Sequence, residues 1–193
     1  MNAFSSPQQK SLEPLRALVE INLHAQKWEA CVAACRALLQ RDSRHHFAQE
    51  SLATSLMQLG HIEEATNATA RLVELSPRDP FHRLRFATLL QMHGKNGDST
   101  REFERVALMY PNEPFSGDAR DAVDNLDRLQ TSQIFLLAAE QPEFRWLLER
   151  DPVAALEENG FYLSENGLES LKQMIPGYDE DEPLDPPKAP RMH

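Results

Sequence analysis

The 193-residue sequence has little of what a membrane protein or a secreted, disulfide-rich protein needs. Its two cysteines, Cys31 and Cys35, are too few for a disulfide framework. It contains no run of about 18 apolar residues, the minimum for a membrane-spanning helix. Residues 1–10 are polar and lack the apolar core of a secretion signal. The sequence therefore predicts a cytoplasmic protein that does not bind membranes.

Recognisable catalytic patterns are also missing. The sequence has no phosphate-binding loop, no nucleophile elbow and no pair of carboxylates in a catalytic context. Cys31 and Cys35 have a spacing that a metal could use, but the periodicity described below makes them buried thiols. His24, His45 and His46 have no accompanying ligand pattern. We therefore expect no enzymatic activity, no cofactor and no metal.

Negative charge is concentrated in the C-terminal part of the chain. Residues 1–111 contain 13 Lys and Arg against 12 Asp and Glu, a net charge of +1. Residues 112–193 contain 7 Lys and Arg against 18 Asp and Glu, a net charge of −11. This negative charge would repel nucleic acid. Residues 176–193 form an acidic, Pro-rich tail that we predict to be disordered. The tail could dock, within one molecule or between two, on a basic cluster of His82, Arg83, Arg85, His93, Lys95, Arg101 and Arg105; alternatively, that cluster is a solvated helical face.

The sequence has few glycines, many Ala, Leu, Glu, Gln and Arg residues, and a regular repeat of small and apolar positions. This composition favours helix over strand. Small and apolar residues recur with a period of about 34 residues. The best copy, residues 46–79, has Leu52, Ala53, Leu56, Gly60, Ala65, Leu72 and Pro77. Residues 80–113 match it with Phe86, Ala87, Leu90, Gly94, Ser99, Phe103, Val106 and Pro111. Residues 12–45 form a degenerate copy with core positions at Leu15, Leu18, Val19, Asn22, Cys31, Cys35 and Leu38, and with Gln26 replacing the turn glycine.

The pattern resembles the tetratricopeptide repeat (TPR), a helix–turn–helix unit with this period. The resemblance implies an all-α protein, an α-solenoid of three TPR-like repeats at 12–45, 46–79 and 80–113. In the first repeat we expect helices at 12–25 and 28–41. After a connection at 112–117, apolar periodicity predicts a long capping helix over 117–140. Three short helices, with starts at Pro142, Asp151-Pro152 and Ser164, then form a small helical module over 141–175.

A TPR-like solenoid implies a protein-binding role, because such repeats bind other chains in a concave groove. The offsets between the core positions predict the groove residues: Glu13, Arg16, Glu20, Leu23, Phe47, Glu50, Thr54, Met57, Phe81, Leu84, Thr88 and Gln91. Phe47, Met57 and Phe81 could hold a peptide, or could instead pack between repeats. Family members that grip acidic chaperone tails use a Lys/Asn/Arg clamp, whereas Glu20, Thr54 and Thr88 occupy that row here. The predicted function is an adaptor or scaffold that binds a peptide or helix of a protein partner.

A second resemblance suggests an alternative function. Residues 136–175 contain a pattern of helix starts and apolar positions at Phe144, Leu147, Leu148, Asp151, Pro152, Ala155, Leu156, Gly160 and Leu163. In this pattern they resemble the helical leader segments of ribosomally made, later modified peptides. This resemblance implies a carrier or precursor whose C-terminal module presents the tail to a modifying enzyme. The tail has no Cys, Ser or Thr after Ser170, which counts against that function. The other interpretation of these residues is a small helical lid that closes the solenoid.

Overall fold

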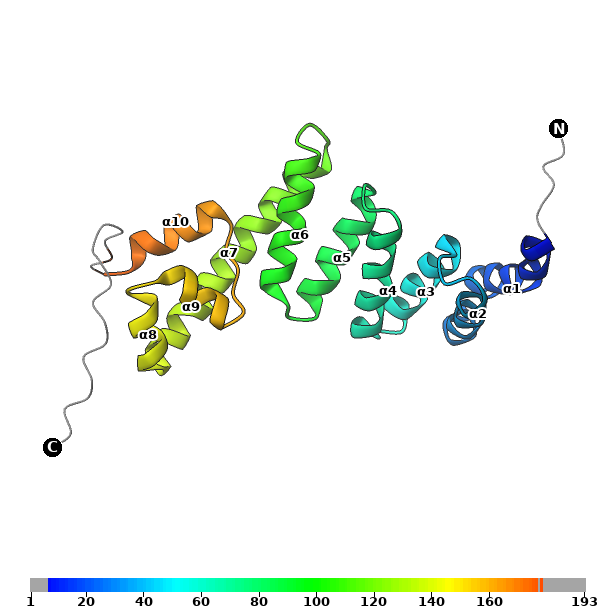
Figure 1. The fold of residues 1–193 in the computed structure, drawn as a ribbon, viewed down its shortest axis with the longest axis horizontal. Coiled ribbons are helices and arrows are strands. Elements are labelled where there is room, and N and C mark those ends of the chain that lie inside the picture. The colour runs from blue at the N-terminus through cyan, green and yellow to red at the C-terminus, as the bar shows by residue number, and fades with distance from the viewer. Residues whose placement is uncertain (1–6, 177, 179–193) are drawn as a thin grey trace.

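The computed structural model describes residues 7–176 and 178, and within them the chain forms ten α-helices and no strand. The helices are α1 (Pro7–His24), α2 (Trp28–Arg41), α3 (His46–Gln58), α4 (Ile62–Leu75), α5 (Pro80–Met92), α6 (Asn96–Met109), α7 (Phe115–Glu140), α8 (Pro142–Leu148), α9 (Pro152–Glu158) and α10 (Glu165–Met174). Each of the first seven packs against the next, so that hairpins α1–α2, α3–α4 and α5–α6 stack in sequence order. Figure 1 shows the resulting elongated array, with α1 at one end and α8–α10 at the other. The chain is an α-solenoid.

The turns within the three hairpins share one backbone conformation. Gly60 and Gly94 have φ angles of 72° and 76°, the left-handed conformation in which glycine carries no steric cost. Gln26 lies one repeat length before Gly60 and also has a positive φ, 53°. The degenerate first copy therefore keeps the turn geometry although it has lost the glycine.

Small residues let the paired helices approach closely. Ala53, Ala65, Ala87 and Ser99 are all 0% exposed. The Ser99 hydroxyl donates to the Ala87 carbonyl at 2.8 Å, so this buried polar side chain has a hydrogen-bond partner at the crossing. Cys31 and Cys35 are fully buried in the first core cluster, as predicted, and burial raises the pKa of the Cys35 thiol.

The long helix α7 serves two cores. Its first half covers the end of the third hairpin with Ala119, Val123 and Leu126, which pack among residues of α5 and α6. Its second half carries Ile134 and Ala138, around which α8, α9 and α10 assemble their own apolar cluster. The capping helix is therefore also the platform for the C-terminal helices.

Two expectations for the first helix differ from the structure. The helix begins at Pro7 rather than near residue 12, because Pro7 suits a first turn and the helix continues through Pro14. Leu18 was expected in the core but is 46% exposed. Its equivalent in the next repeat, Leu52, is buried because α2 lies before α3, whereas no described helix precedes α1. The predicted second helix at 28–41 coincides with α2.

None of the described helices is both long enough and apolar enough to cross a bilayer. The predicted disorder of the tail falls on residues 176–193, which lie outside the described part of the chain except for Pro176 and Tyr178.

Candidate protein-binding groove

The predicted groove residues lie on α1, α3 and α5, and none is fully buried. Exposed members are Glu13, Arg16, Phe81, Thr88 and Gln91. Partly exposed members are Glu20, Leu23, Phe47, Glu50, Thr54, Met57 and Leu84. The face is therefore open to solvent along all three odd-numbered helices of the repeats.

Side-chain contacts connect α1 with α3 across this face. The Arg16 guanidinium carbon lies 5.6 Å from the centroid of the Phe47 ring. The Arg16 Nε is also 3.3 Å from Glu20 Oε1, within α1. Phe47 and Met57 pack partly against the first core cluster, so these two apolar residues divide their surface between the core and the groove.

The next two junctions are aromatic. His46 on α3 and His82 on α5 bring their Nε2 atoms to 3.2 Å, so that one ring donates a hydrogen bond to the other. Phe81 on α5 is 66% exposed, and its ring centroid lies 5.6 Å from that of Phe115 at the start of α7. Together these contacts make one continuous face over α1, α3, α5 and the first turn of α7.

Phe115 contacts the predicted groove residue Phe81, and sequence analysis did not include it. Residues 112–117 were assigned to a connection, whereas the helix begins at Phe115. The signal was present, because Phe47, Phe81 and Phe115 recur at the repeat spacing, at the second or first position of α3, α5 and α7. The solenoid register thus continues into α7.

Three of the four arginines in the predicted basic cluster form ion pairs with carboxylates. Arg83 is buried and forms an ion pair with Glu102, which also accepts from Arg105 Nη1 at 2.5 Å. Arg101 pairs with Asp98 at 3.0 Å. These contacts leave less unpaired positive charge in the basic cluster than the sequence suggested. Docking of the acidic tail stays a prediction, since residues 179–193 are not described.

Polar contacts fasten the C-terminal helices to the third hairpin. The amide of Gln130 on α7 donates to Thr100 Oγ1 at 3.1 Å and to the Tyr162 carbonyl at 2.8 Å, and it accepts from the Tyr162 N–H at 3.2 Å. The Tyr162 ring lies 4.4 Å from the Arg101 guanidinium carbon. Burial, with a hydrogen bond to Glu104, raises the pKa of Tyr162 to about 12. The loop before α10 is thereby held against α6 and α7.

A buried carboxylate positions α10. Asp127 on α7 accepts from the Ser164 N–H at 3.0 Å and from its hydroxyl at 2.5 Å. Ser164 in turn caps α10 by accepting from the Gly167 N–H at 3.1 Å, as the sequence predicted. Burial raises the pKa of Asp127, and the hydrogen bonds from Ser164 act in the opposite direction.

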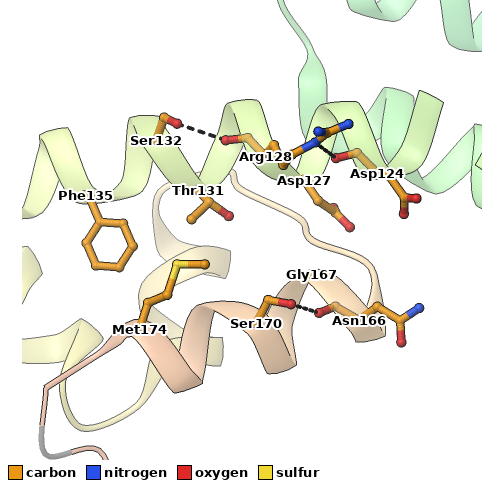
Figure 2. A pocket seen from close by; sticks show the side chains of 10 residues that line it. All are labelled: Asp124, Asp127, Arg128, Thr131, Ser132, Phe135, Asn166, Gly167, Ser170 and Met174. Atoms are coloured by element: carbon orange, nitrogen blue, oxygen red, sulfur yellow. Dashed lines mark hydrogen bonds between the residues drawn. The ribbon is translucent and has the colours of Figure 1, made fainter. Parts of the chain in front are cut away.

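A separate surface feature lies between α7 and α10. It is a cleft of about 770 Å³ lined by Asp124, Asp127, Arg128, Thr131, Ser132, Phe135, Asn166, Gly167, Ser170 and Met174. Figure 2 shows that Phe135 and Met174 form its apolar end, and that the polar residues surround the end where Gly167 approaches α7. Within the part of the chain that the structure describes, no group of three or more His, Cys, Asp or Glu side chains could hold a metal ion.

Comparison with known proteins supports the fold. A T3SS complex from Aeromonas hydrophila matches at 20% identity and a TM-score of 0.51, covering 64% of this chain and 83% of that one. PcrH from Pseudomonas aeruginosa matches at 18% identity and a TM-score of 0.51, covering 65% of this chain and 96% of that one. The Arabidopsis OM64 TPR domain matches at 12% identity and a TM-score of 0.50, covering 63% of this chain and 98% of that one. The fold is TPR-like.

The sequence itself has no such match. No protein-family model matches this chain, and no curated protein matches it. The TPR-like solenoid is therefore recognised from its geometry and from the register of its repeats.

Proposed function

We propose that this protein is an adaptor or scaffold that binds a peptide or helix of another protein. The binding site is the concave groove formed by α1, α3, α5 and the first turn of α7. The observation that carries this proposal is the continuous, incompletely buried face on those helices, which is joined by the Arg16–Phe47 and Phe81–Phe115 contacts. We also propose that the chain is divided into three repeats, at 12–45, 46–79 and 80–113, followed by a capping helix at 117–140 and a helical module at 141–175.

Exposed apolar area supports a role in binding. Phe81 leaves 66% of its surface in solvent on a face that also carries Leu84 and Phe115. An exposed aromatic side chain beside other apolar groups is typical of binding surfaces, where such residues supply most of the affinity. Similarity to a TPR domain and to PcrH supports the fold on which this proposal rests.

Quantitative affinity capture from a host lysate tests the proposal. The bait is the full-length protein, compared with Phe81→Ala in the groove and with Leu108→Ala, a control that is 74% exposed on α6. We expect captured partners to be lost or reduced with Phe81→Ala and retained with Leu108→Ala. Equal capture by all three proteins would place the binding surface elsewhere.

A further inference from the structure

Carboxylates outnumber basic side chains at the predicted groove positions on α1 and α3. Three carboxylates lie at the predicted groove positions, namely Glu13 and Glu20 on α1 and Glu50 on α3. Arg16 is the one basic side chain at the predicted groove positions, and Glu20 lies 3.3 Å from it. No ion pair within the described residues engages Glu13 or Glu50. The remaining polar groups at these offsets, such as Thr54, Thr88 and Gln91, are neutral.

The apolar surface is concentrated at the other end of the same groove. The Phe115 ring lies 5.6 Å from Phe81 and 6.0 Å from Tyr110, measured between centroids. Phe115 and Leu84 pack on the third core cluster, and the Tyr110 hydroxyl donates to the Arg78 carbonyl. Phe115, Leu84 and Tyr110 are therefore held in place by the fold, while Phe81 stays 66% exposed. A large apolar side chain from a partner would cover Phe81.

We propose that the groove selects a segment of a protein partner that carries Lys or Arg side chains along α1 and α3, and an aromatic or large aliphatic side chain at the Phe81–Phe115 site. This inference rests on the proposed function and adds the chemical class of the ligand to it. Unpaired carboxylates in a concave surface attract basic segments and repel acidic ones. The aromatic site fixes the register of the segment, because only a large apolar group covers Phe81.

Selection from a random-peptide library displayed on phage tests this inference, with the full-length protein as the immobilised target. We expect the enriched peptides to contain more Lys and Arg than Asp and Glu, together with at least one Phe, Tyr, Trp, Leu or Met at a preferred distance from the basic residues. Enrichment of neutral or acidic peptides would overturn the inference.

Charge-reversal variants then locate the selection on the chain. The affinity of an enriched peptide, measured by isothermal titration calorimetry, should fall about tenfold with Glu50→Lys, because the substitution replaces an attraction by a repulsion. Glu63→Lys is the matched control, since Glu63 is an exposed glutamate on α4 outside the groove, and it should leave the affinity unchanged. Raising the salt concentration should weaken binding to the wild type more than to Glu50→Lys.

Two variants separate failure of this inference from failure of the proposed function. Phe81→Ala should weaken the same peptide by about tenfold or more, and Leu108→Ala should not. If Phe81→Ala weakens binding and Glu50→Lys does not, the groove binds peptides but does not select basic ones. If neither substitution changes the affinity, or if the library yields no enriched peptide, the groove is not the binding site and both proposals fail.

Discussion

The Tyr162 hydroxyl donates a hydrogen bond to Glu104 Oε2 at 2.6 Å, although 58 residues separate them in the chain. This contact joins the loop before α10 to α6 in the third hairpin. With the Gln130 and Asp127 contacts, it makes the C-terminal helices a closing element of the solenoid and supports the lid interpretation of residues 141–175.

Tyr162→Phe should loosen this closing element. The substitution keeps the ring and its packing against Arg101 but removes the donor to a charged acceptor, so we expect a loss of about 1–2 kcal/mol in the free energy of unfolding. Hydrogen exchange should accelerate in α8–α10 while α2–α4 are unchanged. An unchanged exchange pattern would show that the hydrogen bond contributes nothing to docking.

The same tyrosine predicts a dependence on alkaline pH. Its folded-state pKa is about 12, above the value of about 10 in an unfolded chain, so the folded state holds the proton more tightly. Its contribution to stability is complete below about pH 10 and is lost as the pH rises towards 12. Urea denaturation from pH 8 to pH 11 should show a steeper decline for the wild type than for Tyr162→Phe. Parallel declines in the two proteins would contradict this assignment.

Gly167→Ala should disrupt the docking of α10. A Cβ at Gly167 would overlap Asp127 Oδ2, an atom that the Ser164 hydrogen bond holds in place. Such overpacking costs about 1–3 kcal/mol. The matched control is Gly117→Ala, whose Cβ would have no neighbour within 4 Å, and whose place in helix α7 should make alanine neutral or stabilising. Thermal unfolding of both variants checks this; equal melting temperatures would refute it.

Gln26→Gly should stabilise the first hairpin. Gln26 has a φ of 53°, which costs a residue with a Cβ about 1 kcal/mol relative to glycine in the left-handed region. The gain should appear as a higher midpoint of urea unfolding, and the converse change Gly60→Ala should lower it. No gain would mean that the Gln26 side chain compensates for its backbone strain.

The repeats were predictable because their signals are local or periodic. The turn glycines, the Asp151-Pro152 and Ser164 helix starts and the small residues at helix crossings each act within one hairpin or one helix end. The exposure of Leu18 could not be predicted from its position in the repeat, because that position is buried only where another helix precedes the repeat. That condition holds for Leu52 and fails for α1.

Contacts that close the C-terminal end had no sequence signal. Gln130, Asp127 and Tyr162 are polar or amphipathic residues outside any repeat, and their partners lie 30 or more residues away. Phe115 is the exception, because its spacing of one repeat from Phe81 could have placed it in the groove. The groove residues were predicted from their offsets between the core positions, and the role of the groove in binding stays a prediction.

The carrier alternative makes a separate prediction about the tail. A protein whose C-terminal module presents the tail to a modifying enzyme would be trimmed or altered in its native host. We expect instead the unmodified full-length mass, because the helices at residues 142–174 pack on α7 of the solenoid. Intact-mass spectrometry of the native protein decides this, and a shifted mass that maps to residues 176–193 would favour the carrier.

Site-specific photo-crosslinking tests the groove most directly. A photoreactive residue replaces Thr88, which is exposed in the groove on α5, or Arg71, which is exposed on α4, in otherwise unchanged full-length protein. In host lysate, the account predicts a discrete protein adduct from position 88 and none from position 71. An adduct from position 71 alone, or equal adducts from both positions, would contradict binding in the concave groove.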